Sequence, residues 1–360
     1  MMDTLKVALV GCGKVGRLHC IALKQCPDAR LVALCDASET RAGQFASEFG
    51  GAAFTQLSQM LSMARPDVVL IATPHPLHKE PTVQALASGV HVLVEKPLAA
   101  SVSDCDAMIA AARQSGKILG VISQRRFFEP VLRMKQAIDA GKIGKPVLGF
   151  FLMYSWRSLE YYKSDPWRGK WDTEGGGVLV NQSPHQLDIL RWFMGPISEV
   201  QGYYSTLNHP GVEVEDTAVA SLKFANGGLG SILASVSQKP GIHTKVHVHG
   251  SNGASVGVET DRGATFIAGM TSIPEPPLND LWTISGEENL LAGFQAEDRE
   301  KISRVDPTVH YHALQFRDFF DSVRKNRPPL VSAEDGRAVV ELFQAIYTSS
   351  REGRPVKLSG

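Results

Sequence analysis

Three glycines near the start of the chain have the spacing that binding a pyrophosphate requires. They lie within residues 11–16, in the sequence GCGKVG, between an apolar run over residues 6–10 and a helical pattern. In such a turn the first glycine allows a tight bend, the second lets the backbone approach a pyrophosphate, and the third lets the helix pack closely on the strand. Free N–H groups at the start of the helix favour the anion. The expected dinucleotide contacts here are Gly11, Gly13, Lys14, Val15 and Gly16.

An acidic residue further along the chain indicates which dinucleotide binds. A second apolar run, over residues 31–35, ends in Asp36, 20 positions after Gly16. A carboxylate at that place accepts hydrogen bonds from the ribose hydroxyls and repels a 2′-phosphate. The sequence therefore predicts NAD as the cofactor and favours it over NADP.

A second group of polar residues follows three consecutive glycines in the middle of the chain. Asn181, His185 and Asp188 are spaced i, i+4 and i+7, so a continuous helix would place them on one face. Pro184 is awkward inside a helix, which favours a regular helix that begins there. Two interpretations stay open: a catalytic histidine, or a core histidine whose hydrogen bonds are satisfied by Asp188.

The elements that position these residues alternate between strand and helix through the first third of the chain. Short apolar runs separated by helices predict a doubly wound parallel sheet, the α/β Rossmann architecture, over residues 1–123. Ligands bind at the carboxyl ends of such strands, where Asp36, Thr73 and Lys96 fall. The expected strands span residues 6–10, 31–35, 67–71, 91–94 and 118–122, and the expected helices 39–49, 57–63, 79–88 and 101–112.

The pattern changes after about residue 124. Longer alternating runs with few helices between them predict an α+β domain over residues 124–360, with a large and mainly antiparallel sheet. The segment 274–307 is polar and contains prolines, so it predicts either a loop over the site or an arm between subunits. The expected strands span residues 146–156, 202–205, 217–224, 228–236, 245–249 and 254–258, and the expected helices 131–140, 313–325 and 333–349.

Composition excludes several classes of partner. The 360 residues carry 37 basic and 37 acidic side chains, which argues against nucleic acid or an acidic membrane surface. No apolar stretch approaches the roughly 20 residues that cross a bilayer. The five cysteines form no CxxC pair, and the first strand begins so near Met1 that we expect no signal peptide. These features predict a cytoplasmic protein with reduced thiols.

Histidines on one expected strand raise the question of a metal. His247 and His249 alternate and so share a face, with His243 close by on the same strand. No carboxylate lies at a useful spacing in the sequence, and hydride transfer needs no metal. We therefore expect these histidines on a solvated or interface face of the sheet, and we predict no metal site.

Taken together, the motifs resemble the Gfo/Idh/MocA family of NAD(P)-dependent sugar and cyclitol oxidoreductases. The resemblance rests on the GxGxxG turn, on ATP at residues 72–74, on EKP at residues 95–97, and on GGGxLxNxxxHxxD at residues 175–188. It extends over nearly the whole chain. The cofactor contacts that the resemblance implies are Thr73, Pro74, His78, Glu95, Lys96, Pro97, Trp167 and Arg168. The substrate contacts that it implies are Lys96, Arg126, Tyr154, Asn181 and His185.

The resemblance also assigns roles to two of these residues. Lys96 matches the active-site lysine beside the nicotinamide, with a cis peptide bond expected before Pro97, and His185 matches the catalytic histidine. The position of Asn181 commonly holds an aspartate that pairs with that histidine. The asparagine form, together with the Trp-Arg pair at residues 167–168, is similar to the nucleotide-sugar 3-dehydrogenases and related glycoside-oxidising enzymes.

The implied chemistry suits these side chains. Oxidation of a secondary alcohol removes the hydroxyl proton as hydride leaves the carbon. A partly desolvated lysine beside a cationic nicotinamide has a lowered pKa and can take or position that proton at neutral pH. His185 can accept or relay the same proton. Because Asn181 supplies no charge to the imidazole, Lys96 and His185 are equal candidates for the base.

We therefore expect an NAD-dependent oxidoreductase that transfers hydride between the nicotinamide and a ring secondary alcohol of a sugar, glycoside or nucleotide-sugar. An inositol-type cyclitol dehydrogenase and an NAD-dependent glycosidase of the same fold are the alternatives. A non-catalytic NAD sensor is a third, and the presence of both Lys96 and His185 argues against it. The expected partners are a small carbohydrate substrate and further copies of the chain, as a dimer or tetramer formed through the C-terminal sheet.

Overall fold

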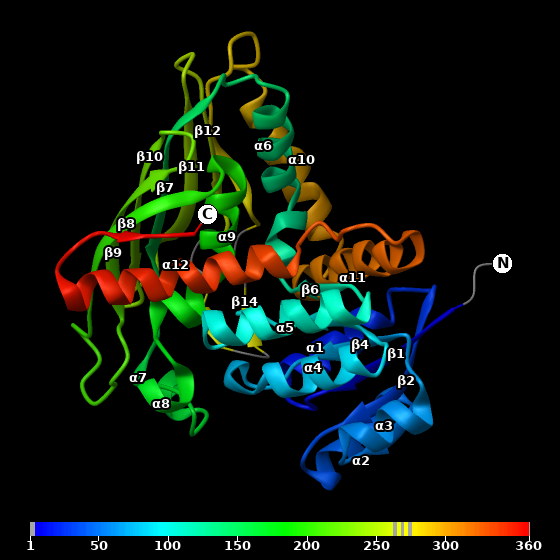
Figure 1. Ribbon diagram of the computed structural model, residues 1–360. Helices are drawn as coiled ribbons and strands as arrows, with labels where there is room; N and C mark the ends of the chain where they lie inside the picture. The colour runs from blue at the N-terminus through cyan, green and yellow to red at the C-terminus, as the bar shows by residue number, and fades with distance from the viewer. Residues whose placement is uncertain (1–3, 262–264, 268–269, 273–275, 360) are drawn as a thin grey trace. The chain divides into compact units, whose positions relative to one another are not determined.

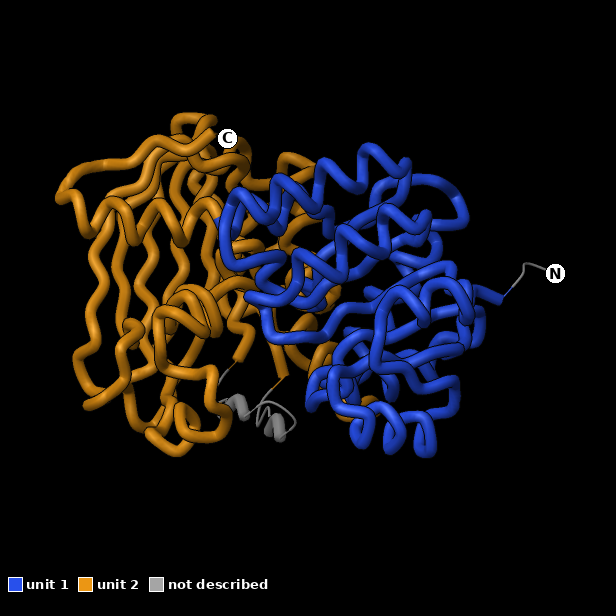
Figure 2. The backbone as a smooth tube through the Cα atoms, turned by 60° about the horizontal axis from the view of Figure 1, so that its bottom comes forward, with its two compact units in different colours: residues 1–124, 307–340 blue, residues 125–306, 341–360 orange. Residues whose placement is uncertain are grey.

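The computed structural model describes residues 4–261, 265–267, 270–272 and 276–359. The chain divides into two compact units, each described here by itself (Figure 2). The first contains residues 1–124 and 307–340, and the second contains residues 125–306 and 341–360. Residues 307–340, which lie within the span 124–360 expected for the second domain, therefore pack with the N-terminal unit.

The first unit is built on a six-stranded sheet in which every pair is parallel. Its strand order, β3-β2-β1-β4-β5-β6, reverses direction between β1 and β4, and ligands bind at such a switch point in doubly wound sheets. The predicted Rossmann architecture is confirmed. The strands are β1 (Leu5–Val10), β2 (Ala29–Cys35), β3 (Ala52–Phe54), β4 (Val68–Ile71), β5 (His91–Val94) and β6 (Leu119–Val121).

Helices pack on this sheet through apolar faces, and α4 and α5 lie side by side (Figure 1). Helix α11 packs against α1, where Phe316, Phe319 and Phe320 join the core beneath β1 and β4. Gln315 of the same helix bonds the backbone of Val121 and Ser123 at the end of β6. The helices are α1 (Lys14–Leu23), α2 (Glu39–Phe49), α3 (Leu57–Ala64), α4 (Lys79–Ala87), α5 (Val102–Ser115) and α11 (Pro307–Lys325).

The second unit is built on an eight-stranded sheet in the order β15-β12-β11-β7-β10-β9-β8-β16. All of its pairs are antiparallel except β7 with β10, so the predicted mainly antiparallel sheet is confirmed. The strands are β7 (Pro146–Tyr154), β8 (Ile197–Ser205), β9 (Thr217–Phe224), β10 (Leu229–Ser235), β11 (His243–Gly250), β12 (Ser255–Glu259), β15 (Leu278–Trp282) and β16 (Val356–Lys357). A separate pair joins β13 (Thr265–Ile267) to β14 (Met270–Ser272).

One face of the large sheet is covered by helices. A methyl group on Gly149 of β7 would lie 2.7 Å from Met194, and one on Gly202 of β8 would lie 3.1 Å from Ile346, so glycine allows close helix packing at both places. The helices of the second unit are α6 (Glu129–Asp139), α7 (Leu159–Lys163), α8 (Trp171–Glu174), α9 (Pro184–Met194) and α10 (Leu291–Ser303). Helix α12 (Ala333–Glu352) begins in the first unit and ends in the second.

The segment expected to be a loop or an arm is largely regular. Of residues 274–307, the structure describes those from 276 onward, and they form β15 and α10. Asn279 of β15 bonds the backbone oxygens of Pro130 and Gly257, and Arg133 of α6 pairs with Asp298 of α10 at 2.7 Å. The sequence pattern did not predict β15 and α10, because these contacts are hydrogen bonds and an ion pair made by polar residues, and a polar stretch lacks the apolar periodicity of a buried strand or helix.

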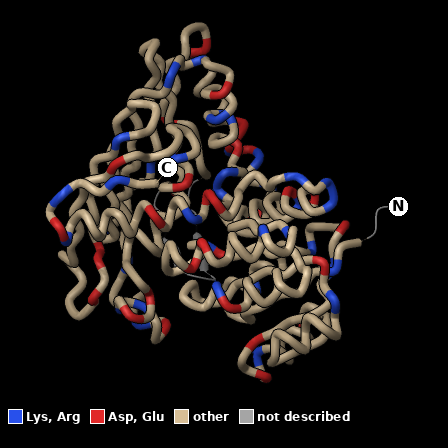
Figure 3. The backbone as a smooth tube through the Cα atoms, in the orientation of Figure 1, with Lys and Arg blue, Asp and Glu red and all other residues tan. Residues whose placement is uncertain are grey.

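Charge and hydropathy agree with the composition. Basic and acidic residues are interspersed along the backbone in both units (Figure 3). Within the described chain, no helix combines the length and the apolar character that crossing a membrane requires.

Candidate active site

The glycine turn has the geometry that its sequence predicts. Gly11 follows β1 with φ +99°, and a methyl group there would lie 2.7 Å from the backbone of Ala72. A methyl group on Gly16 would lie 2.0 Å from the oxygen of Gly11, so helix α1 can approach β1 only because Gly16 has no side chain. Contacts within the protein thus explain why both positions require glycine.

Gly13 differs, because nothing in the protein explains it. A methyl group on Gly13 would meet no atom within 4 Å, and its φ of −97° is open to any residue. Gly13 and Lys14 are exposed at the start of α1, and the N-cap residue Gly13 has no side chain that could cap the helix. An exposed helix N-terminus beside an open glycine suits a pyrophosphate, so these residues fit the dinucleotide.

Asp36 follows β2 and is held by three groups. Its carboxylate accepts the backbone N–H of Cys12 at 2.9 Å and that of Ser38 at 2.8 Å, and it accepts Arg41 Nη2–H at 2.7 Å. Burial acts to raise the pKa of Asp36, but the bonds from Arg41, Ser38 and Cys12 outweigh it and lower that pKa. Asp36 is therefore ionised and fixed to the glycine turn.

His78 lies beneath two loops instead of presenting its ring to the surface. It is fully buried, with Nε2 2.9 Å from the oxygen of Thr73 and Nδ1 3.0 Å from that of Pro97. Burial lowers its pKa. His78 thus connects the loops after β4 and β5, and its contact with the cofactor stays a prediction. Thr73 itself is half-buried and Pro74 is exposed at the end of β4.

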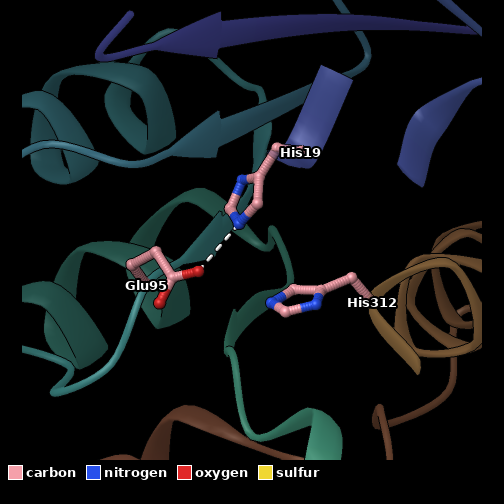
Figure 4. A group of neighbouring side chains, drawn as sticks. All are labelled: His19, Glu95 and His312. Atoms are coloured by element: carbon pink, nitrogen blue, oxygen red, sulfur yellow. Dashed lines mark hydrogen bonds and ion pairs between the residues drawn. The ribbon is translucent and has the colours of Figure 1, made fainter. Parts of the chain in front are cut away.

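Glu95 ends β5 and forms a buried cluster with two histidines (Figure 4). Its Oε1 accepts His19 Nε2–H from α1 at 2.8 Å, and ligating atoms of His19, Glu95 and His312 all lie within 4.8 Å of one another. Burial alone would raise the pKa of Glu95, but the bond from His19 and the charges of His19, His312 and Lys96 hold it at about 2. Burial lowers the pKa of His312 to about 4.

At His19 the cluster lacks an outer hydrogen bond that is usual at a metal site. A histidine that binds metal almost always donates its other N–H to an acceptor, whereas His19 Nδ1 has no partner among the described residues. His312 differs, because its Nδ1 lies 2.7 Å from the backbone oxygen of Thr308. The hydrogen bond between His19 and Glu95 uses two of the atoms that a metal would bind, so the geometry fits a hydrogen-bonded cluster. The sequence did not predict that these three residues form a group, because they lie 76 and 217 positions apart.

Lys96 follows Glu95 at the carboxyl end of β5. It is half-buried, its backbone N–H donates to Glu95 Oε2 at 3.0 Å, and the expected cis bond joins it to Pro97. The same carboxylate therefore fixes the backbone of Lys96 and the ring of His19.

Asn181 lies before helix α9, in a turn of π-helix over Val178–Gln182. The expected continuous helix through Asn181 and His185 is interrupted because α9 begins at Pro184. Asn181 Nδ2–H donates to Oε1 of Glu174, a fully buried residue of α8 that also accepts the N–H of Gly169 at 2.5 Å. The sequence pattern missed Glu174, which follows a tryptophan and an aspartate in a stretch that has no clear periodicity.

Helix α9 carries both His185 and Asp188. His185 is buried in the first turn of the helix. Asp188 accepts Arg126 Nε–H at 2.8 Å and Nη2–H at 2.5 Å, so each of its oxygens binds the guanidinium. Arg126 has 1% of its surface exposed, and its contact with substrate stays a prediction. Arg126 and Asp188 form a buried pair that fixes α9.

Arg168 stacks between two aromatic rings. Its guanidinium carbon lies 4.3 Å from the ring centre of Trp167 and 4.4 Å from that of Tyr161. Its Nη1–H donates to Tyr161 Oη at 2.5 Å, and Gln182 Nε2–H donates to the same oxygen at 3.0 Å. Tyr161 thus joins Arg168 to the turn that carries Asn181.

Tyr154 ends β7, with its ring 5.5 Å from that of His243 on the neighbouring strand. On β11, His247 Nε2 lies 2.9 Å from Asp280 of β15, a carboxylate whose place the sequence spacing did not show. Lys245 bonds the same carboxylate at 2.8 Å. The ion pair accounts for this histidine without a metal.

Two protein-family models match the chain. Residues 5–123 match the model of the oxidoreductase family with an NAD-binding Rossmann fold, and residues 131–256 match the GFO/IDH/MocA C-terminal domain. The chain belongs to the Gfo/Idh/MocA family. The family identity confirms the resemblance in the motifs and, with the glycine turn, identifies NAD as the cofactor and the chain as an oxidoreductase.

Named relatives span the length of the chain. It is 27% identical to the scyllo-inositol 2-dehydrogenase (NAD(+)) of Bacillus subtilis, over 99% of this chain and 97% of that protein. It is 25% identical to the D-glucoside 3-dehydrogenase of Escherichia coli, over 98% and 97%. The WlbA dehydrogenase of Bordetella pertussis, solved with NADH and UDP-GlcNAcA, superposes with a TM-score of 0.87 at 27% identity, covering 100% of this chain and 99% of that one.

Proposed function

We propose that the protein oxidises a ring secondary alcohol of a sugar, glycoside or nucleotide-sugar with NAD, or reduces the matching ketone. One observation carries the proposal: Lys96 lies two residues after the carboxyl end of β5, in the same parallel sheet in which β1 ends at the open glycine turn. The dinucleotide site and an amine that can handle a proton thus share the carboxyl edge of one sheet. The glucoside 3-dehydrogenase and the WlbA dehydrogenase act on or bind ligands of this class.

The two units divide the work in this proposal. The first unit binds NAD, which supplies the hydride acceptor, and it carries Lys96. The second unit binds the sugar and carries His185, Asn181 and the Trp167–Arg168 pair. Either Lys96 or His185 takes the hydroxyl proton, and the contacts of Trp167, Arg168 and Tyr154 with cofactor or substrate remain predictions.

A second substrate class has support of its own. Relatives that span the whole chain include a scyllo-inositol 2-dehydrogenase, so a cyclitol is the alternative. Asn181 separates the two, because an aspartate is expected at its position in inositol-type enzymes. In this chain the amide donates to Glu174, which supports the sugar-type assignment.

A panel of sugars, glycosides, nucleotide-sugars and inositols tests the proposal. Purified protein is mixed with NAD and each compound, and NADH formation is followed by absorbance. We expect net NADH from at least one ring alcohol other than an inositol. A glycosidase would release aglycone without net NADH, a sensor would do neither, and activity with inositols alone would move the assignment to cyclitols.

We also propose that the chain forms a homo-oligomer through the second face of its large sheet. On that face Tyr203, Val219, Leu233 and Leu152 lie in one row across four neighbouring strands, as their pairing shows. Tyr203 is 61% exposed, and Leu229, four residues before Leu233 on the same strand and face, is 55% exposed. An apolar row of this kind is typical of protein interfaces. Light scattering should give a dimer or tetramer, and Leu229→Lys should yield monomers.

A cytoplasmic location is the remaining part of the proposal. All five cysteines are buried and free, which suits a reducing compartment. Fractionation of cells expressing the tagged protein tests this directly.

A further inference from the structure

Among the residues that the structure describes, one buried arginine of the second unit lacks the carboxylate partner that the other buried arginines have. Four arginines of the described chain have less than a tenth of their surface exposed, and three of them hold a carboxylate. Arg125 pairs with Asp261, Arg126 with Asp188, and Arg168 with Asp165. The fourth, Arg157, is 7% exposed, and it has no carboxylate partner among the described residues. An uncompensated buried charge is costly, so this exception needs a cause.

The hydrogen bonds that Arg157 makes are to neutral groups. Its Nη1–H groups donate to the backbone oxygen of Trp156 at 2.7 Å and to Ser155 Oγ at 3.3 Å. Its buried Nε–H has no acceptor. Burial lowers the pKa of Arg157, although a hydrogen bond with Tyr161 and the charge of Asp261, which pairs directly with Arg125, act to raise it. A guanidinium binds oxyanions best through two parallel N–H groups, and Nε–H is one that has no acceptor.

Other buried polar atoms near Arg157 also have no partner. The backbone N–H of Arg157 bonds Val236, and Trp156 forms a bridge with Ser237, so residues 236–238 lie beside it. Ser237 Oγ and Gln238 Oε1 are both buried without a hydrogen bond. Such atoms are rare in folded proteins and are commonly satisfied by a ligand or water. Oxygens beside a guanidinium suit a ligand that carries hydroxyls as well as negative charge.

Arg157 is also joined to the motif that carries the candidate substrate residues. Its guanidinium carbon lies 5.5 Å from the ring centre of Tyr161, whose hydroxyl accepts a bond from Gln182. Gln182 follows Asn181, and its own Oε1 is buried without a partner. Arg157, with its unpaired donor, and Gln182, with its unpaired acceptor, therefore both contact Tyr161, next to the turn before α9.

We propose that Arg157 binds an oxyanion of the substrate, so that the sugar on which this protein acts is anionic. The oxyanion is a carboxylate of a sugar acid or a phosphate of a nucleotide-sugar, and a guanidinium recognises both. The inference rests on the proposed function for the identity of the ligand as a sugar. It goes beyond that function by naming the charge of the substrate and the residue that selects it.

Four sugars separate the two sources of negative charge. Glucose carries neither group, glucuronate carries a carboxylate, UDP-glucose carries a diphosphate, and UDP-glucuronate carries both. Binding of each is measured by calorimetry on the full-length protein saturated with NADH, and turnover with NAD is measured separately. Variants are Arg157→Gln, Arg157→Lys and, as a control that removes an exposed guanidinium of the same unit, Arg354→Gln.

Wild-type protein should bind at least one anionic sugar more tightly than glucose. Arg157→Gln should weaken that binding on the order of 100-fold, as loss of one member of a buried charge pair does. Glucose binding should not change, Arg157→Lys should recover part of the loss, and Arg354→Gln should behave as wild type. A loss confined to glucuronate identifies the carboxylate, and a loss confined to UDP-glucose identifies the diphosphate.

Two results would overturn the inference. One is a wild-type protein that binds no anionic sugar more tightly than glucose. The other is an Arg157→Gln protein with a lower melting temperature and unchanged selectivity, as an ion pair between Arg157 and Asp261 in solution would give. Arg157-dependent binding of an anionic sugar without NADH formation would instead support the inference and contradict the proposed function.

Discussion

Glu95 Oε1 accepts a hydrogen bond from His19 Nε2 at 2.8 Å. This bond joins helix α1, which begins at the glycine turn, to the end of β5, where Lys96 follows. The other oxygen of Glu95 holds the backbone N–H of Lys96. Both residues are buried, so the bond is little screened by water. The backbone of Lys96 is thus fixed to helix α1 through one ionised carboxylate.

Replacing this carboxylate should change how stability depends on pH. The pKa of Glu95 is about 2 in the folded protein against 4.5 for the ordinary group, so its contribution is present above pH 4.5 and is lost as pH falls toward 2. The difference corresponds to about 3 kcal/mol at neutral pH, and about half of it should be lost by pH 3. Urea unfolding of wild type and Glu95→Gln between pH 6 and pH 3 measures it.

The control for that experiment is Glu48→Gln, which removes an exposed carboxylate of the same unit that pairs with Arg17. Its difference from wild type should change little over the same range. If the stabilities of Glu95→Gln and wild type stay parallel from pH 6 to pH 3, Glu95 is not an ionised partner of His19.

The open space at Gly13 predicts a substitution that affects only the cofactor. Gly13→Ala should fold with an unchanged melting temperature, because its methyl group meets no protein atom, but it should weaken NAD binding on the order of 100-fold by meeting the pyrophosphate. Gly43→Ala in α2, also free of contacts, should stabilise the protein by about 0.5–1 kcal/mol and leave NAD binding unchanged. Titration with NAD and thermal melts would contradict this if Gly13→Ala bound NAD normally.

Asp36 and Arg41 together should determine the preference between the two dinucleotides. Removing the carboxylate releases Arg41, which can then pair with a 2′-phosphate, so Asp36→Ala should raise the affinity for NADP relative to NAD by at least about tenfold. The ratio cancels any loosening of the turn that the lost bond to Cys12 causes. Adding Arg41→Ala should remove the gain. Equal binding of both cofactors by the wild-type protein would refute the role of Asp36.

Because Asn181 donates a hydrogen bond to Glu174, a negative charge at position 181 should destabilise the fold. An aspartate at position 181 would place a second carboxylate against the buried oxygen of Glu174, and the pair would hold a shared proton in the folded state. Because that raises the folded pKa of the pair, Asn181→Asp should be destabilised at pH 8 and largely recover at pH 5. Melting temperatures at the two pH values test this, with the exposed Asn289→Asp as the control. Equal losses at both values would show that the substitution does not bring two carboxylates together.

The local parts of this fold could be predicted from the sequence, since short-range rules determine them. The glycine turn, Asp36 at its strand end and the alternation of strand and helix depend on neighbours in the chain. Helix α9 could not be placed fully, because whether a helix continues through residues 181–184 depends on the π-turn and on Glu174, which lies outside the pattern.

Pairs that are distant in the sequence could not be predicted at all. Arg126 and Asp188 are 62 positions apart, and His19 and Glu95 are 76 apart, so no spacing rule connects them. For the same reason α11 was assigned to the second domain, although its phenylalanines complete the core of the first unit. Segment 274–307 was read from composition, which reports polarity but not the partner that satisfies it.

The transfer of hydrogen from a sugar carbon to NAD tests the central claim most directly. Substrate identified in the panel is prepared with deuterium on every ring carbon, and the NADH that forms is examined by mass spectrometry. We expect NADH that carries one deuterium, and turnover about 10²–10⁴-fold lower in Lys96→Met with NAD affinity retained. NADH without deuterium, or a Lys96→Met protein that turns over normally, would contradict the account.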